Sequence, residues 1–176
     1  MIRLLILISS FYFPFFSLCQ SLTLVDLNIR YDNPSDGENA WSNRKVSTLN
    51  WLKDQEADLY FFQEVLRHQY IDLQEKLDGY KCYGVGREDG NKKGEYCPIF
   101  YKTDRFDLKD TLTIWLSPNP SVPGKGWDAA CERVATLVIL TDKRDEQTLV
   151  CINTHWDHVG KIAQEKSAQL ILQLLE

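Results

Sequence analysis

The sequence lacks the short motifs that mark several common enzyme classes. No C-x-x-C pair occurs among its five cysteines, so their spacing matches no zinc site. It also contains no G-x-x-x-x-G-K-[ST] loop for nucleotide phosphates and no G-x-S-x-G motif around a nucleophilic serine. Any catalytic chemistry must therefore come from residues that are far apart in the sequence.

An excess of positive charge is also missing. The chain has 20 lysines and arginines against 25 aspartates and glutamates, a formal net charge of −5. This balance argues against a broad basic surface for nucleic acid. A small phosphate-binding site is still compatible with it, because metal ligands are themselves acidic. The length of 176 residues predicts about one domain, and no internal repeat or low-complexity segment occurs.

No apolar run reaches the roughly 20 residues that a transmembrane helix needs. The apolar segment from Leu4 to Leu18 follows Arg3, is interrupted by Pro14 and predicts a signal peptide over residues 1–19. The protein is then secreted or periplasmic, and residues 20–176 form the domain. Lipid modification of Cys19 is the competing interpretation, which the bulky Leu18 disfavours.

Four cysteines lie outside this segment, at positions 82, 97, 131 and 151. In an exported protein they could form disulfides, and the sequence does not indicate a pairing. Cys151 lies inside an apolar run and is predicted to be a packed thiol.

Hydrophobic periodicity predicts a chain of mixed α and β structure with one large sheet system. Strands are expected over 22–31, 59–62, 80–85, 98–101, 106–115, 133–140 and 148–153. Helices are expected over 44–55, over 67–77 and from about residue 161. Loops rich in glycine, proline and polar residues are expected over 32–39, 86–94 and 117–127.

Polar side chains stand where several of these strands end. The clearest case is the stretch 150–160, where an apolar run changes into Asn153, Thr154, His155, Asp157 and His158. Strand ends are rigid positions at which folds of this class present chemistry. Asn153 and Asp157 share the parity of His155 if the extended backbone continues, so Asp157 is expected to orient or tune the imidazole. His158 is expected in the loop behind the site.

Two other strand ends carry hard oxygen ligands. Glu64 follows the apolar run of residues 59–62, and Asn28 lies on the polar face of the first strand. Together they suit Mg²⁺, which takes few protein oxygens and keeps water for a substrate phosphate. The alternatives are a solvated or ion-paired Glu64, an Asn28 bonded to a local turn, and a purely structural His155.

Arginines could hold phosphate oxygens through paired hydrogen bonds. Arg87 lies in a glycine-rich loop and Arg133 begins a strand, but a solvated loop charge and an ion pair with Glu132 explain them equally well. One of the tryptophans is expected beside the cleft, and the others in the core or in loops. Two classes of function remain: metal-assisted hydrolysis of a phosphate ester, and non-catalytic binding by a secreted domain.

Taken in order, seven short motifs resemble the endonuclease/exonuclease/phosphatase superfamily, and most closely its exported bacterial members. They are Asn28-Ile29-Arg30-Tyr31, Gln63-Glu64-Val65, the stretch 84–90, the stretch 94–101, Gly126-Trp127-Asp128-Ala129-Ala130, Arg133-Val134-Ala135-Thr136 and the stretch 153–158. Each motif alone is weak, but the complete series is specific and covers nearly all of residues 22–176.

The resemblance implies an α/β (α+β) fold, a four-layer α/β/β/α sandwich, and hydrolysis of phosphodiesters or phosphomonoesters with Mg²⁺, or alternatively Mn²⁺, as cofactor. By matching motifs, Asn28 and Glu64 form the metal site. His155 contacts the scissile phosphate, and Asn153 and Asp157 support it. The matching residues expected to line the cleft are Arg30, Arg87, Glu95 and Arg133.

The sequence also departs from the family pattern. Members of the family continue with a Gly-Asp-Phe-Asn type motif and a Ser-Asp-His type motif, and neither is present. We therefore expect a sandwich that is incomplete at its C-terminal end and a chain that is inactive or nearly so. A phosphate ester is the expected partner, nucleic acid is not indicated by the charge, and no obligate protein partner is inferred. The particular phosphoester remains open.

Overall fold

The computed structural model describes residues 21–176. Seven strands, three α-helices and one 3-10 helix follow one another along this part of the chain. In chain order they are β1 (Leu24–Asn28), η1 (Pro34–Asn39), α1 (Trp41–Gln55), β2 (Leu59–Gln63), α2 (Arg67–Lys76), β3 (Tyr80–Tyr83), β4 (Ile99–Lys102), β5 (Phe106–Trp115), β6 (Val134–Asp142), β7 (Thr148–Thr154) and α3 (Lys161–Leu174). The signal peptide predicted for residues 1–19 and the alternative lipid site at Cys19 lie outside the described residues.

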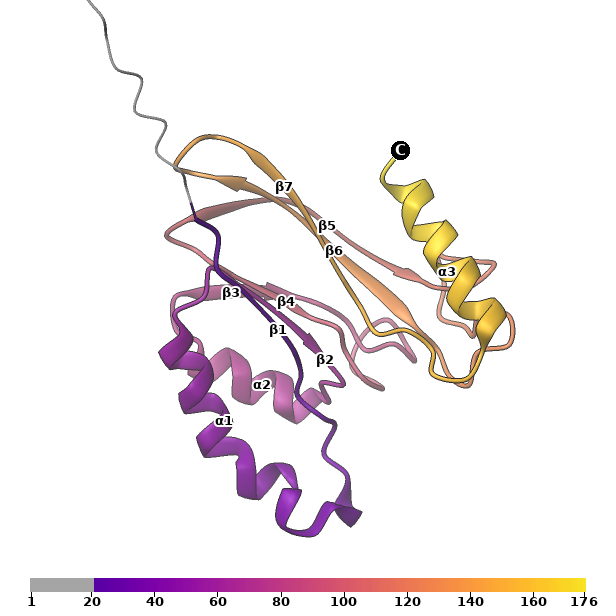
Figure 1. Cartoon of the computed structure of the whole chain (residues 1–176), viewed down its shortest axis with the longest axis horizontal. Coiled ribbons are helices and arrows are strands. Elements are labelled where there is room, and N and C mark those ends of the chain that lie inside the picture. Colours follow the sequence, from indigo (N-terminus) through magenta and orange to yellow (C-terminus); the bar gives the residue numbers. More distant parts are fainter. Residues whose placement is uncertain (1–20) are drawn as a thin grey trace, which may run out of the picture.

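The first sheet has the strand order β1-β2-β4-β3. Strands β1 and β2 are parallel, with Asn28 opposite Gln63, so their carboxyl ends meet at one edge. Helices α1 and α2 cover the outer face of this sheet (Figure 1). Apolar side chains spaced along each helix, such as Leu49 and Leu52 of α1 and Leu73 of α2, pack there against Tyr60 and Phe62. This helical spacing is the pattern that the sequence shows.

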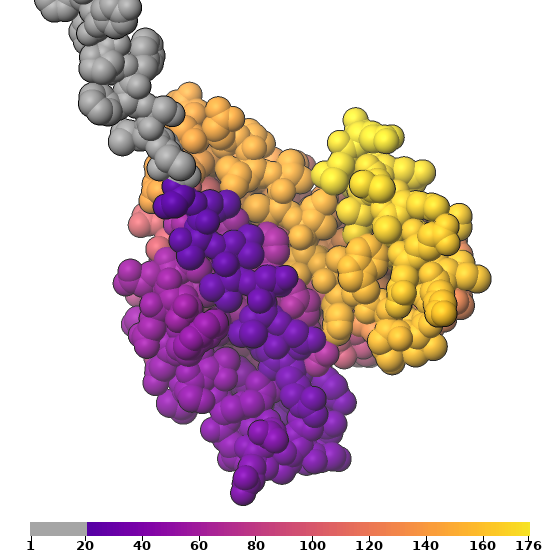
Figure 2. Space-filling view, viewed as in Figure 1, coloured from indigo at the N-terminus to yellow at the C-terminus, as the bar shows by residue number. Residues whose placement is uncertain are grey.

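The second sheet is antiparallel and has the strand order β5-β6-β7. Its inner face packs on the first sheet, and the buried residues of that contact are Leu59, Ile99, Tyr101, Phe106, Val138, Leu140 and Cys151. Helix α3 lies on the outer face, where Leu170, Ile171 and Leu174 pack against Ile114 and Leu137. The layers are therefore α/β/β/α, and the predicted mixed fold is confirmed. Figure 2 shows α3 on the opposite side of the molecule from α1 and α2.

Several elements differ in length from their predicted ranges. Strand β1 ends at Asn28, before Arg30, because Arg30 has a φ of 59° that an extended strand cannot continue through. Helix α1 begins three residues earlier than expected, and the Asp32 carboxylate accepts a hydrogen bond from the backbone N–H of its first residue, Trp41. Strand β7 ends at Thr154, so the alternation of its faces stops before His155.

The cysteines at positions 82, 97, 131 and 151 are all free thiols. Cys97 and Cys151 are buried, as expected for Cys151 from its apolar run. Across residues 21–176, no helix combines the length and the apolar character that crossing a membrane requires.

Candidate active site

The candidate site lies where strands of both sheets end together. Asn153, the penultimate residue of β7, donates hydrogen bonds from Nδ2 to the carbonyl oxygens of Phe62 (2.8 Å) and Pro98 (2.9 Å) in the first sheet. Its Oδ1 accepts a hydrogen bond from Gln63 Nε2 at 2.7 Å. A buried amide with these three bonds ties the end of β7 to the ends of β2 and β4. Residues that follow each strand are thereby brought to one place.

Glu64 is held at this edge by hydrogen bonds to both of its carboxylate oxygens. Asn28 Nδ2 donates to Oε1 at 2.8 Å, and the backbone N–H of Tyr31 donates to Oε2 at 3.1 Å. Burial acts to raise the pKa of Glu64, but these hydrogen bonds and nearby positive charge outweigh burial, and its pKa lies below the usual value. Glu64 is therefore an ionised carboxylate at neutral pH.

Asn28 orients the carboxylate of Glu64. Its amide nitrogen points to Glu64, while its Oδ1 accepts a hydrogen bond from the backbone N–H of Arg30 at 2.8 Å. The side chain of Arg30 turns away from the strand ends and forms an ion pair with Asp36 at 2.6 Å. The structure thus places Asn28 next to Glu64 as expected, and it directs Arg30 to η1 instead of the cleft.

His155 lies across from Glu64, with His155 Nε2 at 4.0 Å from Glu64 Oε1. Its Nδ1 is buried and has no hydrogen-bond partner within the described part of the chain. Burial and the positive charge of Arg133 lower the pKa of His155. The imidazole is therefore neutral at pH 7, and its Nε2 is too far from Glu64 Oε1 for a hydrogen bond.

Arg87 and Glu95 form a bidentate ion pair, with Arg87 nitrogens at 2.8 and 3.0 Å from the two carboxylate oxygens. Burial raises the pKa of Glu95 in spite of the opposing charge of Arg87. The indole N–H of Trp115 donates to the Arg87 carbonyl oxygen at 2.6 Å and fixes the backbone of this loop. Arg87 Nε is buried and has no hydrogen-bond partner among residues 21–176.

Arg133 is positioned by Asp157. Asp157 Oδ2 accepts from Arg133 Nε at 3.3 Å and from the Ala130 N–H at 3.1 Å, while Oδ1 accepts from the N–H groups of Val159 (3.0 Å) and Gly160 (2.7 Å). Asp157 contacts Arg133, not His155, because β7 has already ended and the chain has turned. Its expected role as a support therefore applies to the arginine.

These side chains enclose a cavity of about 360 Å³. Its lining residues are Tyr31, Glu64, Arg87, Glu95, Cys131, Arg133, His155 and His158. Five of them are residues that the sequence predicted for the site: Glu64, Arg87, Glu95, Arg133 and His155. Asn28, Asn153 and Asp157 do not line the cavity but hold its walls in place.

Three lining residues were not predicted there. Tyr31 has no predicted role beyond its place in the first motif, and His158 is expected in the loop behind the site. Cys131 was counted only among possible disulfides. Strand alternation could not have found Cys131, because it lies at a bend before β6 begins at Val134.

The donor set fits a metal that takes few protein ligands. Of the two carboxylates lining the cavity, Glu95 is held by Arg87, whereas Glu64 is oriented by neutral groups and faces the open volume. Residues 21–176 contain no group of three or more histidine, cysteine, aspartate or glutamate side chains arranged around a metal position. One carboxylate together with water and substrate oxygens is an arrangement that Mg²⁺ accepts.

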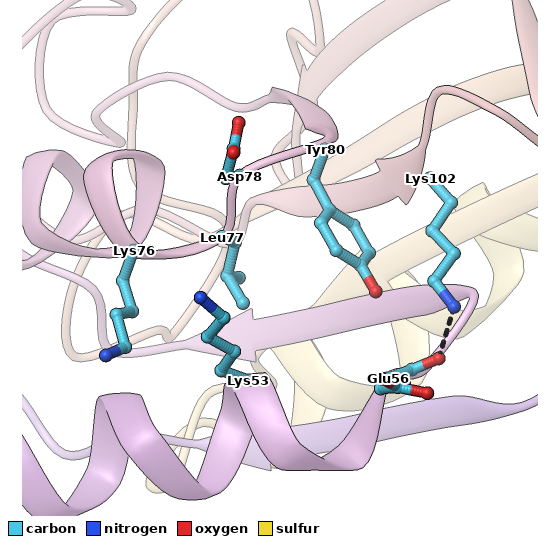
Figure 3. A pocket seen from close by; sticks show the side chains of 7 residues that line it. All are labelled: Lys53, Glu56, Lys76, Leu77, Asp78, Tyr80 and Lys102. Atoms are coloured by element: carbon cyan, nitrogen blue, oxygen red, sulfur yellow. Dashed lines mark hydrogen bonds between the residues drawn. The ribbon is translucent and has the colours of Figure 1, made fainter.

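A second hollow, of about 270 Å³, lies at the opposite end of the first sheet (Figure 3). Lys53, Lys76 and Lys102 line it, at the ends of α1, α2 and β4. Lys102 donates to the carbonyl oxygen of Glu56 at 2.5 Å, and Lys76 donates to Asn50 Oδ1 at 2.6 Å. No histidine lines this hollow, so the cavity around Glu64 and His155 is the candidate active site.

No family model matches the chain. Several solved structures are similar to it. A Bacteroides vulgatus protein described as an endonuclease/exonuclease/phosphatase is 44% identical, with a TM-score of 0.84 over 86% of this chain and 59% of that one. A mannosyl-6-phosphatase from Bacteroides thetaiotaomicron is 38% identical, with a TM-score of 0.84 over 88% of this chain and 59% of that one.

A more distant match shares the fold alone. It is humanized D. rerio TDP2, which is 17% identical with a TM-score of 0.68. The chain spans about three fifths of the length of the two Bacteroides structures.

Proposed function

Because the chain belongs to the endonuclease/exonuclease/phosphatase superfamily, we propose that its cavity binds a phosphate ester for metal-assisted hydrolysis. The observation that carries this proposal is the composition of the cavity. In a protein of net charge −5, two arginines and two histidines line one small hollow together with two carboxylates, of which Glu95 is paired with Arg87 and Glu64 is not paired with an arginine. Such a set attracts an anion and leaves one position for a divalent cation.

Each lining group has a distinct task. Glu64 would hold Mg²⁺, with Mn²⁺ as an alternative, and Asn28 keeps its carboxylate in place. When bound, the metal supplies Lewis-acid stabilisation of charge on a phosphate oxygen. His155, whose imidazole is neutral, donates a hydrogen bond from its ring N–H to an oxygen of the phosphate. Arg87 and Arg133 neutralise the remaining phosphate charge.

The proposed substrate is a phosphomonoester of an alcohol about the size of a sugar. A cavity of about 360 Å³ is at the lower end of small-molecule sites. The 38%-identical mannosyl-6-phosphatase supports the same substrate class. We further propose that the protein is exported, on the strength of the apolar segment from Leu4 to Leu18.

The alternative function is phosphate binding without catalysis. It is favoured by the lack, within residues 21–176, of a three-residue metal cluster, and by the absence of a second ionised carboxylate free to activate water at the cavity. On the same ground we propose that turnover by the 176-residue chain is slow.

Two measurements on this chain test the proposal. The first is inorganic phosphate binding by titration calorimetry, with Mg²⁺ and with EDTA. The second is release of phosphate from mannose 6-phosphate and p-nitrophenyl phosphate. We expect phosphate to bind in the presence of Mg²⁺ and to bind at least tenfold more weakly in Glu64→Gln and His155→Ala. His68→Ala is the matched control, because His68 pairs with Asp32 on the helical side of the first sheet.

The outcomes separate the two functions. Slow hydrolysis that EDTA and Glu64→Gln abolish supports the esterase. Binding with no turnover at all favours the binding module. Absence of phosphate binding, or equal binding by all three variants, refutes both.

A further inference from the structure

His158 has a defined hydrogen-bonding state. Its Nδ1 lies 3.1 Å from Arg133 Nη2. A guanidinium only donates hydrogen bonds and stays charged, so Nδ1 must accept and carries no proton. In this contact the ring N–H of His158 is therefore the one on Nε2.

The groups around His158 keep this contact in place. Asp157 holds the same edge of the guanidinium through Arg133 Nε, and it also accepts hydrogen bonds from the backbone N–H groups of Val159 and Gly160, which directly follow His158. Arg133 and Asp157 are both buried. Both ends of the contact are thus anchored by one carboxylate, and the Nε2–H tautomer is imposed by the fold.

His158 and His155 face different partners within one cavity. His155 approaches Glu64, and its Nδ1 is left without a partner in the described chain. His158 contacts Arg133, and the nitrogen left over is Nε2, which carries a proton. The two rings therefore offer the cavity different groups, and only for His158 does a protein contact determine that the free nitrogen is a donor.

We propose that His158 is a substrate-binding residue whose Nε2–H donates a hydrogen bond to an oxygen of the bound phosphate group, beside Arg133. The proposal rests on the proposed function, since it requires an oxyanion in this cavity. It gives Arg133 two roles, contact with the anion and selection of the donating tautomer of its neighbour. Loss of the Arg133 contact would leave His158 free to exchange tautomers and to donate less often.

Two substitutions distinguish donation from positioning. In His158→Asn the amide oxygen takes the place of Nδ1 and can still accept from Arg133, but the Nε2–H is lost. In His158→Gln the longer side chain returns an N–H to the Nε2 position. We expect inorganic phosphate to bind about tenfold more weakly to the Asn variant, in keeping with loss of a hydrogen bond to a charged group. The Gln variant should stay within about threefold of the wild type.

The tautomer is measured independently by ¹⁵N imidazole NMR of the ligand-free 176-residue protein. We expect His158 to show an unprotonated Nδ1 and a protonated Nε2. A proton on Nδ1 would overturn the proposal, as would wild-type phosphate affinity in the Asn variant. If the 158 variants bind phosphate normally while His155→Ala does not, the proposed function stands and this inference fails. If the wild type binds no phosphate, both fail.

Discussion

Replacing Asp157 by asparagine should lower the free energy of unfolding by about 3 to 5 kcal/mol, the usual cost of removing one partner from a buried ion pair. The side chains of Asp157 and Arg133 are only 2% and 6% exposed. In the variant the amide oxygen can keep the N–H groups of Val159 and Gly160. The amide nitrogen, however, replaces the carboxylate oxygen that accepts hydrogen bonds from Arg133 and Ala130. The new N–H donors would then lie against the N–H donors of those two residues.

The pH dependence of this loss has a definite sign. Burial acts to raise the pKa of Asp157, but hydrogen bonds from three backbone N–H groups and from Arg133 outweigh it and hold the pKa well below its usual range. A carboxyl group whose pKa falls on folding contributes stability that is complete above its unfolded pKa of about 3.9 and is lost as pH falls towards the folded value. The difference in stability between wild type and Asp157→Asn should therefore narrow below about pH 4.

Urea denaturation followed by tryptophan fluorescence measures both effects. Asp107→Asn is the matched control, because Asp107 pairs with Lys143 at the surface, where the two side chains are 62% and 39% exposed. Such a pair is worth at most about 1 kcal/mol. Equal losses in the two variants, or a loss below about 1 kcal/mol for Asp157→Asn, would show that the buried network does not stabilise the site loops.

Three further results are expected. A Cβ at Gly126 would lie 2.0 Å from a main-chain oxygen, whereas a Cβ at Gly124 would meet nothing within 4 Å. Gly126→Ala should therefore lower the free energy of unfolding by about 1 to 3 kcal/mol, and Gly124→Ala by less than about 1 kcal/mol. Equal urea midpoints for the two variants would contradict the close approach. Asn153→Ala should cost roughly 2 to 4 kcal/mol, because it removes the buried hydrogen bonds to the carbonyl oxygens of Phe62 and Pro98 and the one from Gln63; a loss under about 1 kcal/mol would rule out the inter-sheet tie. Burial raises the pKa of Cys97 to about 12, so iodoacetamide at pH 8 should leave it unlabelled in the native protein. Iodoacetamide should label Cys131, and bound phosphate should protect Cys131 from labelling. Peptide mass spectrometry measures both. Labelled Cys97 would contradict the burial of that thiol, and Cys131 labelled equally with and without phosphate would contradict the location of the site.

Local patterns in the sequence were sufficient for most elements of the fold. Residues 59–62, 106–115 and 148–153 were recognised as strands from apolar runs, and two helices were recognised from the spacing of leucines. The element bounds shifted by a few residues where side chains or backbone angles intervened. Arg30 is the clearest example: its left-handed backbone ends the strand, and its guanidinium forms an ion pair with Asp36. Hydrophobic periodicity predicts neither feature.

In the candidate site, too, the sequence predicts some features and the packing of the sheets decides others. Glu64 and His155 could be identified because each follows an apolar strand and carries a group that is costly to bury without a purpose. Their separation of 4.0 Å depends on how two sheets stack, which the sequence pattern of either strand does not contain. For Asp157, alternation along a strand predicts contact with His155, whereas the chain turns after Thr154 and the carboxylate contacts Arg133.

By itself, then, the sequence determined which segments are strands and helices, the family that the chain resembles, and that Glu64 and His155 follow strands; the resemblance added Arg87, Glu95 and Arg133 to the expected cleft. Periodicity and motif order carry this information because burial acts on local patterns. The tertiary structure alone decided which side chain contacts which: that Asn28 orients Glu64, that Glu95 is held by Arg87, and that His158 contacts Arg133 at the cavity. Hydrogen bonds and ion pairs depend on distances of a few ångströms between residues many positions apart, and only the packed sheets set those distances.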